Sequence, residues 1–124
     1  MRRLTHREEE IMELFWEKGS LFVKEIIDML SDPKPHYNTI STIVRTLEEK
    51  GFVGHEQFGN TYRYHALISR EEFSRNTLKE VIGKYFDKSY AAVISMFVQE
   101  EKISPEEIQE LIRQAKSGKA KSNE

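Results

Sequence analysis

The sequence predicts a mainly α-helical protein with one small β-hairpin, which belongs to the α+β class. Two observations predict this class. Most of the chain repeats apolar residues at the spacing of amphipathic helices, with capping residues where the repeats begin. Residues 52–66 instead combine β-branched and aromatic side chains around a Gly59-Asn60 turn. With 124 residues, the chain is one domain, or one small domain with an appendage.

Composition excludes several kinds of site and leaves nucleic-acid binding open. The chain has no cysteine, which removes disulfides, thiolate metal sites and cysteine nucleophiles. Its net charge is -2, so the distribution of charge must decide whether it binds DNA. Residues 33–47 and 57–70 contain basic side chains and no acid, whereas glutamates crowd residues 8–17. Two segments of a slightly acidic chain are therefore locally basic.

The sequence predicts a cytoplasmic protein. No apolar segment follows the first residues, so no secretory signal is expected. No apolar run reaches transmembrane length, so no membrane insertion is expected either. The absence of cysteine is compatible with a reducing compartment.

Capping residues and helix breakers predict the first two helices. Thr5 and Glu8 form a capping box for a helix that continues to Lys18 and ends at Gly19. A second helix covers residues 23–30, where apolar residues follow helical spacing. Two prolines shortly afterwards prevent its continuation and provide the turn of a helix-turn-helix.

A third helix, from about residue 36 to residue 50, has two different faces. Its apolar stripe consists of Tyr37, Ile40, Ile43, Val44 and Leu47. The opposite face has small hydrogen-bonding side chains in its first two turns and acidic Glu48 and Glu49 in its last turn. A phosphate-lined groove accepts the first part and repels the second, so the helix should enter DNA with its N-terminus first. The expected DNA contacts on this helix are Tyr37, Asn38, Thr39, Ser41, Thr42 and Arg45.

The hairpin after this helix has the composition of a DNA-binding wing. Tyr62 and Tyr64 alternate with Arg63 and His65, so one side should face the helices and the other should present cations. We expect Asn60 and Arg63 to contact the DNA backbone or the minor groove. Two helices, a polar third helix and a hairpin, in this order, predict a winged helix-turn-helix domain over residues 1–68.

Residues 69–116 are predicted to form a helical dimerisation region, and residues 117–124 a disordered tail. Ser69 with Glu72, and Ser104 with Pro105, mark helix starts. Three helices alone bury too little surface, so a second copy of the chain is the default partner. The alternative is a monomer in which this region packs on the first domain. The expected dimer contacts are Leu78, Val81, Ile82, Tyr85, Tyr90, Val93, Ile94 and Phe97.

Several motifs resemble the penicillinase and methicillin-resistance repressor family, of the BlaI/MecI type. The threonine-rich residues 38–47 run into Leu47-Glu48-Glu49-Lys50-Gly51 and are followed by a hairpin that ends Tyr62-Arg63-Tyr64. The segments at residues 4–16 and 95–104 are also similar to that family, so the resemblance covers nearly the whole chain. One departure is Phe22, where the family usually has a serine or threonine to cap the second helix.

The resemblance implies a homodimeric repressor that binds a palindromic operator in double-stranded DNA and regulates resistance genes. It also implies a winged-helix domain and a C-terminal dimerisation region. In β-lactam-responsive members, a membrane sensor with a metalloprotease domain triggers cleavage of an Asn-Phe bond in that region. The matching pair here is Met96-Phe97, which keeps the phenylalanine and replaces the asparagine.

Other chemistry finds little support in the sequence. The four histidines lack the spacing of a metal site; His55 and His65 would face each other across the hairpin, but no third ligand completes the pair. No catalytic or cofactor-binding motif occurs, so we expect no enzyme activity, cofactor or small-molecule substrate. The alternative function is a winged-helix module that binds proteins instead of specific DNA. Such a module would expose apolar residues on the third helix, where this sequence has polar ones.

Overall fold

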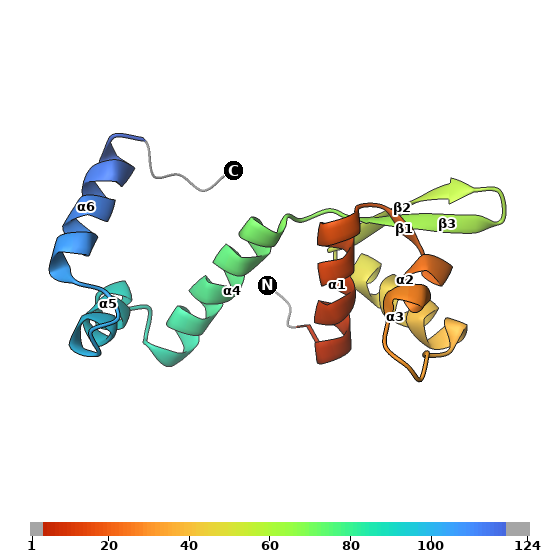
Figure 1. The fold of residues 1–124 in the computed structure, drawn as a ribbon, viewed down its shortest axis with the longest axis horizontal. Coiled ribbons are helices and arrows are strands. Elements are labelled where there is room, and N and C mark those ends of the chain that lie inside the picture. Colours follow the sequence, from red (N-terminus) through yellow and green to blue (C-terminus); the bar gives the residue numbers. More distant parts are fainter. Residues whose placement is uncertain (1–3, 119–124) are drawn as a thin grey trace. The chain divides into compact units, whose positions relative to one another are not determined.

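The computed structural model describes residues 4–118 and divides the chain into two compact units, one ending at Arg70 and the other beginning at Glu71. The predicted α+β class is confirmed (Figure 1). The first unit contains α1 (His6–Lys18), β1 (Leu21–Phe22), α2 (Val23–Met29), α3 (Tyr37–Glu49), β2 (Val53–Phe58) and β3 (Thr61–Ala66). The helices α4 (Arg70–Tyr85), α5 (Tyr90–Gln99) and α6 (Pro105–Lys116) follow.

The sheet of the first unit has three antiparallel strands in the order β1-β3-β2. The predicted hairpin is confirmed, because Phe58 pairs with Thr61 and leaves a two-residue Gly59-Asn60 turn. Gly59 has a φ of 60°, which favours glycine at the first central position of a tight hairpin turn. The strand β1 was not predicted, because its two residues are too few to show the alternation of a strand.

The core of the first unit lies between its three helices and the sheet (Figure 1). Each helix buries apolar side chains completely, and Val53 and Tyr64 contribute from the hairpin. The fully buried helical residues are Ile11, Met12, Ile26, Ile40, Val44 and Leu47. Tyr37 does not join them: it is the first residue of α3 and is 46% exposed, so its predicted place in the apolar stripe was wrong.

The residues that follow the hairpin are fastened to α1 by an aromatic residue and an ion pair. The indole N–H of Trp16 donates to the carbonyl of Ile68 at 2.8 Å. The Arg70 guanidinium lies 5.5 Å from the centroid of the Trp16 ring and forms an ion pair with Glu13. Trp16 therefore connects α1 to the residues that follow the hairpin.

Helix caps agree with the sequence at α1 and are incomplete at α2. At α1, the Thr5 hydroxyl accepts from the Glu8 amide and the Glu8 carboxylate accepts from the Thr5 amide. At α2, Glu25 accepts a hydrogen bond from the amide of Phe22 at 2.8 Å. The Phe22 ring has no acceptor, so the second half of a capping box is missing there.

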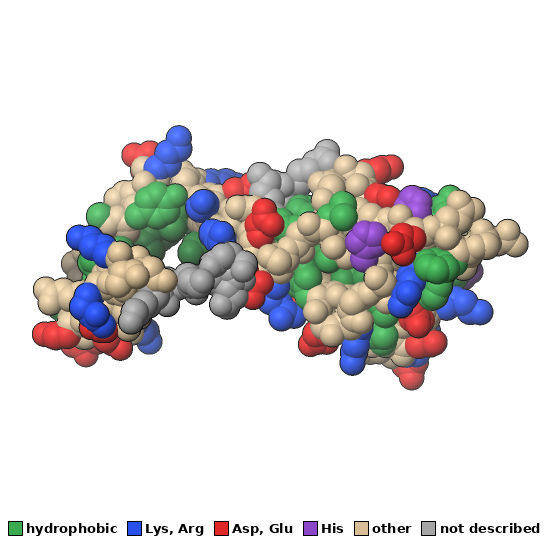
Figure 2. Space-filling model, turned by 90° about the horizontal axis from the view of Figure 1, so that it is seen from above, with side chains coloured by type: hydrophobic (Ala, Val, Ile, Leu, Met, Phe, Trp, Pro, Cys, Tyr) green, Lys and Arg blue, Asp and Glu red, His purple; other side chains and the backbone are tan. Residues whose placement is uncertain are grey.

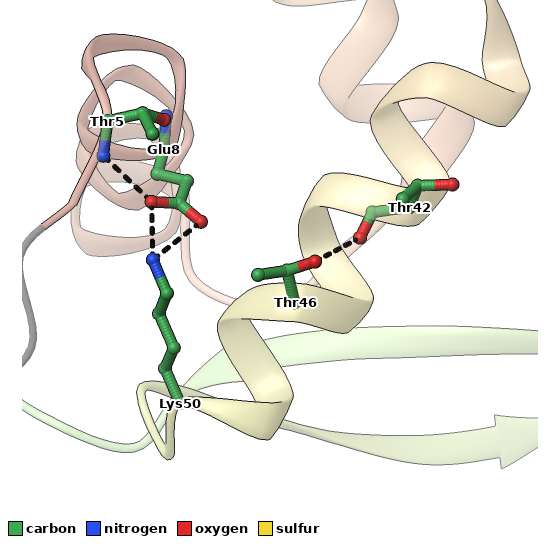
Figure 3. Close-up of polar contacts among 5 residues, drawn as sticks. All are labelled: Thr5, Glu8, Thr42, Thr46 and Lys50. Carbon is green, nitrogen blue, oxygen red and sulfur yellow. Dashed lines mark hydrogen bonds and ion pairs between the residues drawn. The ribbon is translucent and has the colours of Figure 1, made fainter.

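A buried ion pair connects the start of α1 to the end of α3 (Figure 3). The Lys50 ammonium lies 2.9 and 3.1 Å from the two carboxylate oxygens of Glu8, whose residue is only 4% exposed. Burial raises the pKa of Glu8, but the hydrogen bond from the Thr5 amide and the contacts with Lys50 outweigh it, so the pKa lies below its ordinary value of 4.5. The ionised pair therefore stabilises the fold.

Replacing Lys50 with methionine should destabilise the first unit by about 3 kcal/mol, because it leaves the buried Glu8 carboxylate without its cation. Urea unfolding followed by the fluorescence of Trp16, the chain's one tryptophan, would measure the change. Lys18→Met removes an exposed lysine from the same unit and should cost little. Equal losses from both substitutions would contradict a stabilising pair.

The same pair predicts how stability depends on pH. Because the folded pKa of Glu8 is depressed, its contribution is fully present above the ordinary value of 4.5. The contribution is lost as the pH falls through the lower pKa of the folded state. Glu8→Gln should remove this part of the acid dependence, which urea unfolding curves at several acidic pH values would show.

The second unit leaves most of its large apolar side chains at the surface. Within residues 71–118, Ile82 is the one buried residue, at 4% exposure. Hydrophobic side chains of this unit are visible on the surface in Figure 2. The large exposed apolar residues are Leu78, Val81, Tyr85, Tyr90, Ile94, Phe97, Leu111 and Ile112.

Helix α6 begins as predicted, with the Ser104 cap and Pro105 in its first turn. Six residues of the predicted tail, 119–124, lie outside the described part of the chain.

Among residues 4–118, no helix combines the length and the apolar character that crossing a bilayer would need.

Candidate nucleic-acid interface

One face of α3 is polar and open to solvent. The predicted DNA contacts Tyr37, Asn38, Thr39, Thr42 and Arg45 are all exposed, and Ser41 is half-buried. The opposite face is buried in the core, so the orientation of α3 is fixed by packing. The first two turns of this exposed face contain no acid, as the sequence predicted.

Three of these residues form a hydrogen-bonded group on the middle of α3. The guanidinium of Arg45 donates to the hydroxyl of Ser41 at 3.0 Å and to that of Thr42 at 3.4 Å. The Thr46 hydroxyl donates back to the Thr42 carbonyl at 3.0 Å, so it is turned toward the helix (Figure 3). Arg45 therefore lies along the helix surface with two hydroxyls beside it. Guanidinium and hydroxyl groups are suited to the acceptors of base edges and phosphates.

The basic residues before α3 have structural roles. The Lys34 ammonium donates to the carbonyls of Asp28, at 3.0 Å, and of Leu30, and so satisfies the C-terminal end of α2. His36 is the N-cap of α3, where its Nδ1 accepts a hydrogen bond from the Asn38 amide at 3.1 Å. Lys34 and His36, which were expected to make this segment basic, thus form hydrogen bonds within the protein. Arg45 is the cation that α3 itself exposes to solvent.

The hairpin has two chemically different faces, as the alternation predicted. Tyr64 is buried on the side of the helices, at 3% exposure. Arg63 is exposed on the other side, where its guanidinium lies 5.8 Å from the Phe22 ring centroid and 6.0 Å from that of Phe58. Pairing of β1 with β3 places Phe22 directly opposite Arg63, so Phe22 supports this cation. Asn60 is exposed at the turn.

A second set of contacts joins the hairpin to the acidic end of α3. The Nδ1 atom of His55 in β2 lies 2.7 Å from Oε2 of Glu48, and the His55 ring stacks on Tyr62. His55 pairs with Tyr64, and Gly54 pairs with His65, so the two histidines lie on opposite faces. The expectation that they face each other was therefore wrong. The partner of His55 is instead Glu48, a contact that depends on the tertiary fold and leaves no local signal in the sequence.

Electrostatics favours contact with phosphate at the N-terminal half of α3 over its C-terminal end. The helix dipole places partial positive charge at Tyr37 and the residues that follow it. Glu49 is exposed at the other end. Within the described residues, no group of three or more histidine or acidic side chains could hold a metal ion. The exposed surface at the start of α3 is thus suited to recognition of a polyanion.

Three helices, a three-stranded sheet, an exposed polar α3 and a projecting hairpin define a winged helix-turn-helix protein (Figure 1). The chain belongs to the penicillinase repressor family, a family of transcriptional repressors, whose sequence model matches residues 4–117. It is 28% identical over 111 residues to the methicillin resistance regulatory protein MecI of Staphylococcus aureus strain N315. The aligned region covers 87% of this chain and 89% of that protein. It is 25% identical over 114 residues to the penicillinase repressor of Bacillus licheniformis, and this alignment covers 88% of the chain and 86% of that repressor. The predicted family is confirmed.

Proposed function

We propose that this protein is a sequence-specific DNA-binding transcriptional repressor that acts as a homodimer on a palindromic operator. The observation that carries the proposal is the exposed, acid-free first half of α3 with Arg45, Ser41 and Thr42 grouped on it. Membership of a repressor family supports the same conclusion.

In this proposal α3 enters the major groove with its N-terminus first. The small side chains of Asn38, Thr39 and Thr42 let the helix approach base edges closely, and Arg45 donates to guanine acceptors or a phosphate. The wing contacts the sugar-phosphate backbone through Asn60 and Arg63, which positions α3 without adding sequence information. An exposed Glu49 limits entry of the last turn.

The homodimer is supported by the apolar surface of the second unit. Among residues 71–118, this unit buries only one residue and exposes aromatic side chains such as Tyr85 and Phe97. Such an apolar surface needs a partner to cover it. A second copy of the same chain offers a self-complementary surface. Two copies of α3 would then meet half-sites one or two DNA turns apart, at about 34 Å per turn. Pairing also raises the affinity beyond that of one near-neutral chain. Ile82, predicted at this interface, is already buried in the single chain.

Binding of the intact protein to the DNA upstream of its own gene would test the proposal. Fluorescence anisotropy with that duplex and with a shuffled duplex of equal length should show tighter binding to the first. Affinity for both should fall steeply as salt rises, because phosphate contacts release counterions. Equal affinity for both duplexes would remove the claim of sequence specificity, and binding to neither would favour a protein-interaction module.

Arg63→Ala should weaken binding to all duplexes alike, by several-fold at moderate salt, because a wing cation contacts phosphate instead of a base. The slope of log affinity against log salt should become shallower by about one unit for one lost phosphate contact. Anisotropy titrations at three salt concentrations, with operator and shuffled duplexes, would measure both effects. A loss confined to one operator base pair would show instead that Arg63 contacts a base.

We further infer that proteolysis in the second unit would inactivate the repressor by separating the dimer. The Met96-Phe97 bond lies inside α5, where Phe97 is 40% exposed and Met96 is half-buried. A membrane sensor protease system is the proposed source of the cut. Mass spectrometry of the chain recovered from cells exposed to a β-lactam should show fragments ending at Met96 and starting at Phe97. Intact chain under conditions that relieve repression would contradict cleavage as the signal.

A further inference from the structure

The last turn of α3 is tied directly to the hairpin by a charged hydrogen bond. Glu48 belongs to α3 and His55 to β2, and His55 Nδ1 lies 2.7 Å from Glu48 Oε2. Each side chain is 32% exposed, so the contact lies at the boundary between core and solvent. Histidine and acidic side chains also lie side by side on the face of the first unit drawn in Figure 2. The helix expected to contact bases is thereby linked to the hairpin expected to contact phosphates.

The aromatic residues of β3 fix the orientation of His55. Its ring stacks on Tyr62 with the ring centroids 4.2 Å apart and the planes inclined by 22°. Tyr62 in turn meets Tyr64 edge to face, with centroids 6.2 Å apart, and Tyr64 is buried. A continuous row of contacts therefore runs from Glu48 through the outer rings to the core. We call Glu48, His55 and Tyr62 the helix–wing link.

Glu48 and its neighbour Glu49 have different surroundings at the end of α3: Glu48 is half-buried against the hairpin and Glu49 is exposed. Both are glutamates at the end of α3. Glu49 is exposed, and within residues 4–118 its carboxylate makes no hydrogen bond or ion pair. The Glu48 carboxylate is held toward the hairpin by His55. The sequence alone assigned the two residues the same repulsive role, whereas the structure separates them.

We propose that Glu48 and His55 are positioning residues for DNA binding, which hold the wing at a fixed angle to α3 so that both contact one duplex together. The proposal rests on the proposed DNA-binding function. Neither residue needs to touch DNA. Cutting the link leaves α3 able to enter the groove but loosens the outer part of the hairpin, whose base stays held by the buried Val53 and Tyr64. The phosphate contacts of the wing are then made less often. The variants are therefore expected to lose contacts with the DNA phosphates, and the salt dependence of binding measures this loss.

A matched pair of substitutions, Glu48→Ala and Glu49→Ala, separates positioning from charge. Both remove one negative charge from the same end of α3, and alanine is a good helix former. Glu49→Ala should strengthen operator binding by about two- to five-fold, because repulsion of phosphate decreases. Glu48→Ala should weaken it by about five-fold, and its salt slope should be shallower by about one unit, as for one lost phosphate contact.

Substitutions of the histidine complete the test. His55→Ala should reproduce the weaker binding and shallower slope of Glu48→Ala, and the double variant should be no weaker than either single variant. His55→Gln keeps an N–H donor for Glu48 and should recover part of the loss. Thermal unfolding of each variant checks that the first unit stays folded, so that a change in slope reflects positioning.

The outcomes distinguish the link from the function on which it rests. If Glu48→Ala strengthens binding as Glu49→Ala does, or if His55→Ala keeps the slope of the unchanged chain, the helix–wing link has no role in positioning. If the unchanged chain shows no salt-sensitive preference for its operator, the proposed function fails, and the positioning role fails with it. Normal binding by the unchanged chain with additive effects of Glu48→Ala and His55→Ala overturns the link alone.

Discussion

Replacing Phe97 with aspartate is expected to convert the proposed dimer to monomers. Phe97 is 40% exposed on α5 in the single chain, beside the exposed Tyr90 and Ile94. Burying an unpaired carboxylate at such a surface costs on the order of 3–5 kcal/mol, which weakens dimerisation by about two to four decades. Sedimentation velocity over a range of concentrations would show the shift. Operator affinity should fall with it, because each half-site then binds independently.

Ser95→Asp is the matched control for this substitution. Ser95 is exposed on the same helix but lies outside the apolar stripe formed by Tyr90, Ile94 and Phe97. It adds the same charge, so it should leave the dimer intact. Persistence of the dimer in Phe97→Asp would exclude α5 from the interface. Dissociation by both variants would point to a general sensitivity of the second unit to charge.

Arg45→Ala is expected to weaken operator binding by about 10- to 100-fold, corresponding to about 1–3 kcal/mol for a lost base contact. Binding to a shuffled duplex should change much less, because it loses one phosphate contact at most. The reason is the position of Arg45 at the centre of the exposed face of α3, beside Ser41 and Thr42. Anisotropy titrations with both duplexes at one salt concentration would measure the ratio.

Arg7→Ala controls for the loss of a cation from the same unit. Arg7 lies on α1 and forms an ion pair with Glu10 at 3.0 Å, so it should have little effect on operator affinity. Sedimentation should show that Arg45→Ala remains as dimeric as the unchanged chain. Unchanged operator affinity in Arg45→Ala would contradict the proposed orientation of α3 on DNA.

Local signals in the sequence were enough to predict most of the elements. Helix starts follow from side chains that bond to their own helix, as at Thr5 and Ser104, and such bonds depend only on nearby residues. The exposed face of α3 follows from helical periodicity, and the hairpin turn from Gly59-Asn60. These features are encoded within a few residues, so the sequence shows them directly.

The features that the sequence could not show depend on contacts between distant residues. Lys50 and Glu8 are 42 residues apart, and nothing local indicates that this lysine would pair with a buried carboxylate. The strand β1 exists because β3 provides its hydrogen bonds, and its own two residues have no distinctive pattern. The role of His55 likewise depends on where the sheet meets the end of α3. The candidate DNA contacts could be predicted from the sequence, whereas the contacts that orient them could not.

The thin core of the second unit has a consequence for how the protein responds to its own abundance. If Ile82 is buried alone and the remaining apolar side chains are covered only in the dimer, folding of this unit obeys mass action. Its melting temperature would then rise with protein concentration, while that of the first unit would stay constant. In a cell, chains made in small amounts would remain partly unfolded and exposed to proteases. Repression would therefore have a threshold in protein dosage, set by the same residues that join the two copies.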